Sequence, residues 1–372
     1  MTKFIHLRVH TEYSLCSGTV RIKDFVKHLK DSAIPAAAIT DSHNMFGVME
    51  YSLAAMKDGI QPIIGCEIVL DMSKFLANST TITSLPAENI EENFCKIVLL
   101  AKTEHGLLNL MSLLSRSYLE REANLKPHIK LDDLAKKSEG LIILSGGVEG
   151  MLGKAIAQRK LDRVDTIAKY FLDVFQGDFY IEISRHGLDT EMSMERSFID
   201  VAYRHNIPLV ATNDCYFYEK DMFEAQDALF CIANGRYVTE ADRPKLTAEH
   251  YFKSEEEMLE LFKDIPEAVE NTVAIAKKIS TTVQRREPML PHFDLPDGVS
   301  EADEIKRISR LGLEERLERK FLVEKIVAED KREEIRKRYI SQLEFELGVI
   351  TDMDFAGYFL IVADFIVWSK TH

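Results

Sequence analysis

The chain has 372 residues, 46% of them hydrophobic, so it can hold two domains or one large domain with an appendage. Its formal net charge of −14 excludes a chain that grips a phosphate backbone over its whole surface, because that affinity comes from Lys and Arg. Any contact with nucleic acid must therefore be local or lie outside this chain.

The five cysteines are odd in number and have no C-x-x-C spacing, which indicates neither a disulfide framework nor a thiolate zinc cluster. Reduced thiols are the simplest interpretation, and we expect Cys16, Cys66 and Cys215 to be small buried apolar residues rather than nucleophiles. The amino terminus has no apolar signal segment, and the apolar runs stop well short of a membrane span. We therefore expect a cytoplasmic protein that does not contact membranes.

Short apolar runs rich in branched residues alternate with segments of helical period over much of the chain, which is typical of βα units. Apolar residues recur at spacings of three and four between the runs, as in the segment 22–29. Seven such units predict an α/β fold, a distorted βα barrel that is closed or nearly closed. The predicted strands are residues 7–10, 36–40, 62–70, 97–101, 141–145, 179–183 and 209–212.

The first predicted strand places His6, Arg8 and His10 at alternate positions, so that all three would face one side. A pair of histidines at this spacing can bind a metal ion. The guanidinium between them cannot, because it has no lone pair to donate and stays protonated. His6 and His10 could also be core histidines that bond to neighbouring backbone.

Polar residues follow several predicted strands, and the carboxyl ends of barrel strands meet at one rim. Mixed clusters of imidazole and carboxylate suit Mn, Zn or Fe and the hydrolysis of phosphoesters. Glu67 could instead simply pair with Arg8. We expect one rim to gather His10, Asp41, His43, Glu67, His186 and Asp214.

Beyond Asp214 the pattern becomes mainly helical, with a capping box predicted at 254–257 and a helix that begins at Pro266. Residues 287–298 carry three prolines and a glycine without periodicity, which indicates a connection between domains. Residues 301–348 form a charged helical stretch whose mixed signs favour a solvated face. We predict a first domain over 1–280 and a linker with part of a second domain over 281–372. The apolar residues 357–368 before the abrupt end indicate a larger domain.

Five strings resemble, in order, motifs of one family: residues 6–14 (HLRVHTEYS), 39–47 (ITDSHNMFG), 62–67 (PIIGCE), 210–214 (VATND) and 357–365 (GYFLIVADF). That family is the alpha subunit of bacterial DNA polymerase III, the replicative C-family polymerase. The resemblance implies a polymerase and histidinol phosphatase (PHP) domain over 1–280, followed by the first part of the polymerase palm. It also implies that the full-length protein extends primed DNA with deoxynucleoside triphosphates and Mg.

The family's polymerase aspartates lie in a Pro-Asp-x-Asp-x-Asp motif, and its triphosphate loop is a Gly-Arg-Gly-Ser stretch. The resemblance puts both beyond residue 372. Two-metal phosphoryl transfer needs such carboxylates to hold the ions, so we expect this fragment to be inactive as a polymerase.

The resemblance also bears on the barrel site, where it retains the metal-ligand positions His10, Glu67, His186 and Asp214, with Asp41 a less certain match. Metal-loaded members would have histidine at 8, 42, near 96 and at 216, aspartate near 17 and cysteine near 147. The residues at those positions here are Arg8, Ser17, Ser42, Lys96, Gly147 and Tyr216. His43 could substitute for the ligand absent at 42, although a shift of one residue redirects the side chain.

Arg8 and Lys96 put fixed positive charge where cations would bind, and Arg8 could pair with Glu67 or Asp214. We therefore favour a remnant, metal-free site, with bound Mn or Zn as the alternative.

In relatives with a degenerate barrel, the resemblance implies that a separate proofreading exonuclease subunit docks on the PHP domain. The leading hypothesis is thus a scaffold within the replicative holoenzyme, whose primed template and nucleotides bind through parts beyond residue 372. The competing hypothesis is a metal-dependent PHP phosphoesterase or 3′–5′ exonuclease that uses His10, Glu67, His186 and Asp214. A free-standing enzyme like histidinol phosphatase is a third, and the apolar residues 357–368 argue against it.

Overall fold

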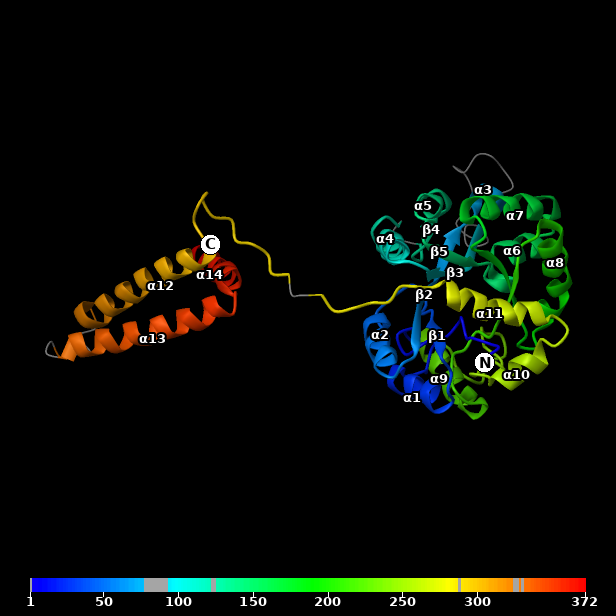
Figure 1. Ribbon diagram of the computed structural model, residues 1–372, viewed down its shortest axis with the longest axis horizontal. Coiled ribbons are helices and arrows are strands. Elements are labelled where there is room, and N and C mark those ends of the chain that lie inside the picture. The colour runs from blue at the N-terminus through cyan, green and yellow to red at the C-terminus, as the bar shows by residue number, and fades with distance from the viewer. Residues whose placement is uncertain (1, 77–92, 122–124, 287–288, 324–327, 329–330) are drawn as a thin grey trace. The chain divides into compact units, whose positions relative to one another are not determined.

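The computed structural model describes residues 2–76, 93–121, 125–286, 289–323, 328 and 331–372. It divides into two compact units, Met1–Arg285 and Arg286–His372 (Figure 1), whereas the sequence placed the boundary at 280. Glu287 and Pro288 of the predicted linker lie outside the described residues, as do 324–327, 329 and 330 of the predicted charged helical stretch.

The first unit is the expected distorted α/β barrel, built on one mixed sheet. The sheet order is β1-β2-β3-β5-β6-β7, with β4 paired to β2. β3 runs antiparallel to both β2 and β5, and the other pairs are parallel. All the predicted strands from 36–40 onward are confirmed. The strands are β1 Ala36–Ile39, β2 Gln61–Asp71, β3 Phe94–Ala101, β4 Ile129–Lys130, β5 Leu141–Leu144, β6 Phe179–Ser184 and β7 Leu209–Thr212.

The strand predicted at 7–10 is wrong as a regular strand, yet this segment joins the two edges of the sheet. Val9 forms an isolated parallel bridge with Cys215, just after β7, and accepts a hydrogen bond from Thr40 N, just after β1, at 2.9 Å. Leu7 packs in the apolar interior, while Arg8 next to it also points inward to carboxylates. The alternation of a regular strand is therefore broken here.

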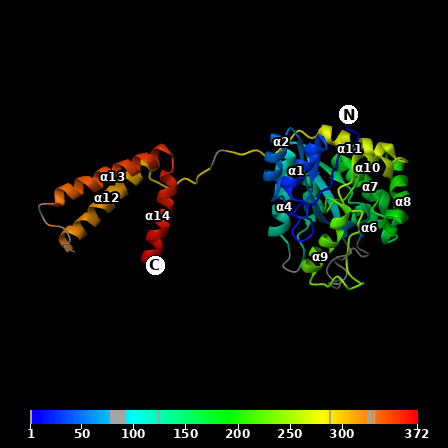
Figure 2. The same cartoon turned by 90° about the horizontal axis from the view of Figure 1, so that it is seen from below.

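Helices surround the strands of this unit in both ribbon views (Figures 1 and 2). α1 buries Ile22, Phe25, Val26 and Leu29, the apolar face predicted from their spacing. The capping box at Ser254 and Glu257 and the helix that begins at Pro266 are also confirmed. The helices are α1 Ile22–Asp31, α2 Val48–Lys57, α3 Ser73–Leu76, α4 Glu104–Leu119, α5 Leu131–Lys136, α6 Met151–Ala157, α7 Leu161–Phe175, α8 Asp189–His205, α9 Phe223–Asn234, α10 Glu255–Leu261 and α11 Pro266–Lys278, with 3-10 turns at Gly147–Glu149 and Lys220–Met222.

One end of the barrel interior is filled with apolar side chains from successive strands, and we call this cluster the floor. Burial of each such aliphatic side chain stabilises the fold by roughly 1.5–3 kcal/mol. The floor therefore fixes the strands without any polar contact. Its members include Leu7, Ala38, Ile63, Val98, Ile142 and Val210, all fully buried.

The second unit consists of α12 Glu301–Glu318, a π-helical turn Arg319–Val323, α13 Arg332–Asp352 and α14 Ala356–Thr371. α12 and α13 lie side by side (Figures 1 and 2). The described core of this unit is small: its apolar cluster consists of Ile305, Leu347, Ala356 and Leu360, and Leu317 and Phe321 are buried as well. Over the described part of the chain, no helix is long and apolar enough to cross a membrane.

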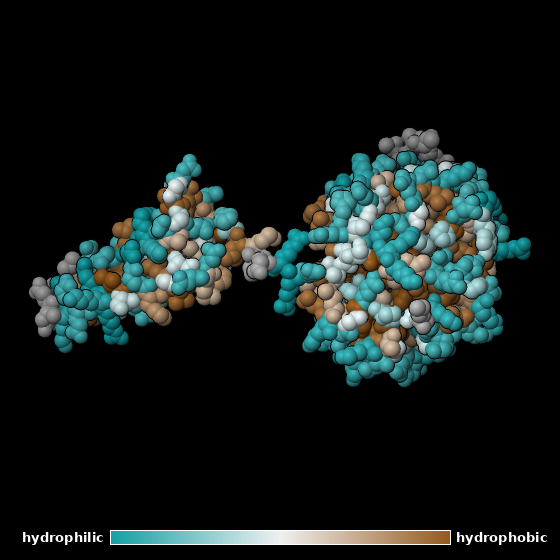
Figure 3. Space-filling model, viewed as in Figure 1, coloured by the Kyte–Doolittle hydropathy of each residue, from teal (hydrophilic) through white to brown (hydrophobic). Residues whose placement is uncertain are grey.

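The surface of the barrel unit in Figure 3 is mostly hydrophilic, with scattered apolar patches. This is the ordinary surface of a globular domain, so surface hydropathy alone does not point to a site.

Candidate functional site

The polar end of the barrel borders a cavity of about 610 Å³. Glu67, His186 and Asp214 line it, and His10 is fully buried at its base. The positions at which the resemblance predicts replaced ligands line the same cavity: Arg8, Ser17, Ser42, Lys96, Gly147 and Tyr216.

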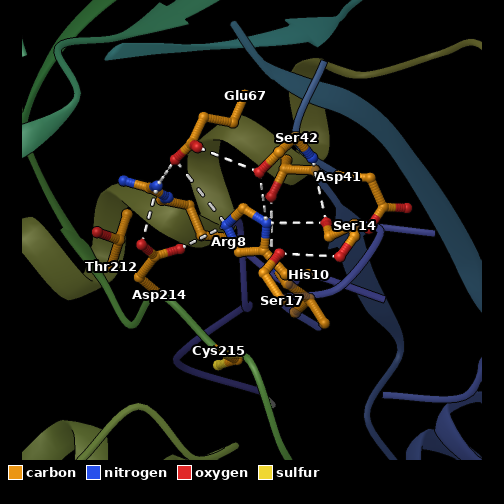
Figure 4. A network of polar contacts seen from close by, with 12 residues as sticks. Arg8, His10, Ser14, Ser17, Asp41, Ser42, Glu67, Thr212, Asp214 and Cys215 are labelled. Carbon is orange, nitrogen blue, oxygen red and sulfur yellow. Dashed lines mark hydrogen bonds and ion pairs between the residues drawn. The ribbon is translucent and has the colours of Figure 1, made fainter. Parts of the chain in front are cut away.

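Arg8 occupies the centre of the polar end, where it meets three carboxylates. Figure 4 shows two of them, Glu67 and Asp214. Nη2 pairs with Oε2 of Glu67 and, at 3.0 Å, with Oδ2 of Asp214, while Nη1 lies 3.1 Å from Oε1 of Glu182. Burial alone would lower the pKa of Arg8. The charges of Asp214, Glu182 and Glu67 outweigh it and hold that pKa well above its ordinary value.

Glu67, on β2, has both oxygens engaged. Oε2 pairs with Arg8, and Oε1 accepts a hydrogen bond from Ser42 Oγ at 3.3 Å and lies 3.6 Å from Lys96 Nζ. Lys96 also pairs with Glu149 at 2.9 Å. Burial would raise the pKa of Glu67, but Lys96 and Arg8 lower it overall, and Glu67 in turn raises the pKa of Lys96.

Asp214 follows β7, and its carboxylate contacts the imidazole of His10 and the guanidinium of Arg8. His10 Nε2 lies 2.8 Å from Oδ1 of Asp214, and Arg8 contacts Oδ2. Burial opposes ionisation, yet Arg8 and then His10 keep the pKa of Asp214 well below its ordinary value. The other face of the site is closed by Tyr216, whose ring stacks on His10 at 4.1 Å, and by Ser14, whose Oγ lies 3.0 Å from His10 Nδ1.

His186 has no ring nitrogen left for a metal ion. Nδ1 lies 2.7 Å from Oε1 of Glu191, and Nε2 accepts a hydrogen bond from the backbone N–H of Asp214 at 3.2 Å. The ring stacks on His250 at 3.9 Å, and burial, with His186 beside it, lowers the pKa of His250 to about 3.

Asp41 serves the loop that follows Arg8 and His10. Its carboxylate accepts hydrogen bonds from Thr11 N at 2.7 Å, Thr11 Oγ1 at 2.7 Å and Ser14 Oγ at 2.6 Å. Its contacts thus hold Thr11 and Ser14, and Asp41 reaches the cluster only indirectly, through the contact of Ser14 with His10. His43 lines the cavity from a left-handed backbone conformation with φ of 59°, and burial lowers its pKa.

His6 lies away from the cavity, so the expectation that His6, Arg8 and His10 share one face is wrong. His6 Nε2 bonds to the carbonyl oxygen of Lys253 at 2.8 Å, and its ring stacks on Phe252 at 3.9 Å. The break in alternation at Leu7 and Arg8 is the reason, because it places His6 on the side away from the cavity, where His6 is still buried.

Glu182, which is fully buried on β6 and contacts Arg8, is absent from the site residues predicted from the sequence. Its signal was present in the sequence, since an acidic residue stands at an inward position of an otherwise apolar strand, and a buried carboxylate needs a partner. The partner was hidden because it lies 174 positions earlier in the chain.

Among the described residues, ligand atoms of His10, Glu67 and Asp214 all lie within 4.8 Å of one another, a spacing that could hold a metal ion. The Arg8 guanidinium lies among them and pairs with both carboxylates. Both ring nitrogens of His10 also have partners already, Ser14 and Asp214. A divalent cation would have to displace a buried, fixed positive charge. As arranged here, these residues do not fit a divalent metal.

Comparison with known proteins gives the family. Residues 6–186 match the PHP domain, and residues 303–372 match the bacterial DNA polymerase III alpha NTPase domain. DNA polymerase III subunit alpha of Caulobacter vibrioides is 40% identical over 99% of this chain and 30% of its own length. The subunits of Rickettsia bellii and Pseudomonas aeruginosa are each 38% identical, again over 99% of this chain and 30% of their own length.

The chain thus spans about 30% of the length of these curated relatives. It is homologous over nearly all of its own length to the amino-terminal region of bacterial DNA polymerase III alpha subunits, and its barrel carries the PHP domain of that family.

Proposed function

We propose that this chain is the amino-terminal region of the catalytic alpha subunit of a cytoplasmic replicative DNA polymerase, and that its barrel is a metal-free scaffold. The homology over 99% of the chain supports the first part. The second rests on the Arg8 guanidinium, which pairs with Glu67 and Asp214 where a metal ion would need them.

The polymerase activity belongs to the full-length protein in this proposal. Its primed template, deoxynucleoside triphosphates and Mg bind to parts beyond residue 372, where the family's polymerase aspartates lie. Since the printed sequence has no Pro-Asp-x-Asp-x-Asp motif, the chain by itself does not extend a primer.

The barrel in this proposal serves other subunits of the replicative holoenzyme, with a proofreading exonuclease subunit docked on it. A barrel held by internal ion pairs suits this role, because it keeps its shape without a cofactor. Proofreading then takes place in the partner and not in the barrel.

Elemental analysis tests the scaffold role most directly. The purified chain is dialysed against Mn, Zn and Mg, its metal content is measured, and cleavage of single-stranded DNA is assayed alongside. We expect less than one ion per chain and no metal-dependent cleavage. The positive control is the double variant Arg8→His/Lys96→His, which replaces both cations with histidine at predicted ligand positions. This variant should take up metal ions in the same assay.

A second function, a metal-dependent phosphoesterase or 3′–5′ exonuclease, draws on the convergence of His10, Glu67 and Asp214 within 4.8 Å beside a cavity. Stoichiometric Mn or Zn in the unaltered chain, together with metal-dependent cleavage, would favour this function over the scaffold.

A further inference from the structure

Glu182 differs in position from the other two carboxylates that surround Arg8. Glu67 and Asp214 are among the described residues that line the cavity, and Glu182 is not. The Glu182 side chain has no exposed surface, whereas that of Asp214 is 16% exposed. A cation that enters through the cavity would therefore meet Glu67 and Asp214 but not Glu182.

Both oxygens of Glu182 are fixed by separate segments of the barrel. Oε1 pairs with Arg8 and accepts a hydrogen bond from Thr212 Oγ1 on β7 at 2.6 Å. Oε2 accepts a hydrogen bond from the backbone N–H of Gly146, after β5, at 3.0 Å. Glu182 cannot turn toward the cavity without breaking contacts on both neighbouring strands.

The three carboxylates also differ in what else neutralises them. Glu67 faces Lys96 as well as Arg8, and Asp214 faces His10 as well as Arg8. In the described part of the chain, Arg8 is the one cationic partner of Glu182. Loss of Arg8 would thus leave Glu182 as the most poorly compensated buried charge.

We propose that Glu182 is the positioning residue that anchors Arg8 among the carboxylates, and that Glu182 itself is not part of the His10, Glu67 and Asp214 cluster. The proposal deepens the scaffold function above and rests on it. In this arrangement Glu182 holds one end of the guanidinium, while the other end blocks the cluster.

A double-mutant cycle of stability tests the anchor. Arg8→Met should lower the Tm by about 5–15 °C, because it strands buried carboxylates. Adding Glu182→Gln should recover more than half of that loss, since it removes the charge with no other cation. The matched control adds Glu67→Gln instead, and it should recover less because Glu67 keeps Lys96 in the single variant.

Metal uptake provides a second readout, which separates an anchor from a metal ligand. Mn²⁺ titration should show uptake by Arg8→Met and equally by Arg8→Met/Glu182→Gln, because Glu182 lies outside the cluster. Arg8→Met/Glu67→Gln should lose this uptake. If adding Glu182→Gln to Arg8→Met abolished Mn²⁺ binding, Glu182 would be a ligand and the anchor proposal would be overturned.

Should Arg8→Met fail to fold, folding of Arg8→Met/Glu182→Gln would support the anchor, and failure of both would overturn it. If the unaltered chain is metal-free and the effects of Arg8→Met and Glu182→Gln on the Tm are additive, this inference alone is overturned. Stoichiometric metal in the unaltered chain would instead overturn the scaffold function.

Discussion

The barrel interior has two halves of opposite character, built from the same strands. β2 supplies Ile63 to the apolar floor and Glu67 to the charged half, and β7 supplies Val210 while Asp214 follows it. The floor is held by burial, which needs no particular partner. The charged half is stable only while its cations and carboxylates match, because each buried charge left alone is costly. Variation in the cavity residues is therefore constrained by charge, and variation in the floor by volume.

The largest loss of stability is expected when a charge is placed in the floor. Ile142 on β5 is fully buried among apolar residues. Ile142→Asp should cost more than about 5 kcal/mol and leave the barrel unfolded, because no cation can pair with the new carboxylate. Circular dichroism and urea denaturation measure this. Leu119→Asp, at a side chain that is 83% exposed, should leave stability nearly unchanged.

The next largest effect comes from removing charge from the charged half. Arg8→Ala should destabilise the barrel by about 3–5 kcal/mol, because it leaves buried carboxylates unpaired. Mn²⁺ should restore part of this stability in the variant and have little effect on the unaltered chain. Thermal unfolding with and without Mn²⁺ provides the measurement, and Arg204→Ala, at an exposed ion pair, is the control. An unchanged Tm together with no Mn²⁺ uptake would contradict the pairing.

Much of the barrel could be predicted because its strands are local patterns. The runs that became β1, β2, β3, β5, β6 and β7 are short, branched and apolar, and the gathering of polar residues at strand ends follows from barrel topology. The positions at which the resemblance predicts replaced ligands, from Arg8 to Tyr216, likewise line one cavity.

What the sequence did not reveal depends on contacts between distant segments. The segment at 7–10 bonds to the stretches after β1 and after β7 without forming a regular strand, and its neighbours Leu7 and Arg8 both point inward. Asp41 follows β1 as expected, but Thr11 and Ser14 take up its oxygens. The role of Glu182 could not be predicted without its partner Arg8, and no local sequence pattern identifies that partner.

The charged half and the rest of the barrel should lose stability in different ranges of acid pH. Burial lowers the pKa of His6 from 6.5 to about 3, so between these values the unfolded chain binds a proton that the native chain does not. Stability should therefore fall as pH drops from 6.5, by about 1–2 kcal/mol at pH 5 for this one group. The pKa values of Glu67 and Asp214 are lowered in the fold, so their stabilisation is kept at pH 5 and is lost only at lower pH.

His6→Gln tests this assignment. Urea midpoints at pH 7 and pH 5 should differ less in His6→Gln than in the unaltered chain. His105→Gln, at a side chain that is 60% exposed, should keep the full difference. Equal acid sensitivity in all three proteins would mean that His6 contributes nothing to it.

The smallest expected effect concerns Lys96, the outer cation of the charged half. Its side chain is 38% exposed and pairs with Glu149 and, at 3.6 Å, with Glu67. Lys96→Met should cost no more than about 1 kcal/mol at neutral pH, because solvent screens such a pair. Lys96 is the charge that most lowers the pKa of Glu67, so the variant should also begin to lose stability at a higher pH in the acid range.

Urea unfolding of Lys96→Met between pH 3 and pH 7 measures both effects, with Lys245→Met as a control at another lysine on the cavity wall. If Lys96→Met were as destabilising as Arg8→Ala, the buried and the exposed cation of the charged half would contribute equally to its stability. Its stability would then depend on total charge alone, and Arg8 would have no special place beside Glu182. A small effect with a shifted acid limb would instead show that the buried guanidinium provides most of the stabilisation and that Lys96 mainly lowers the pKa of Glu67.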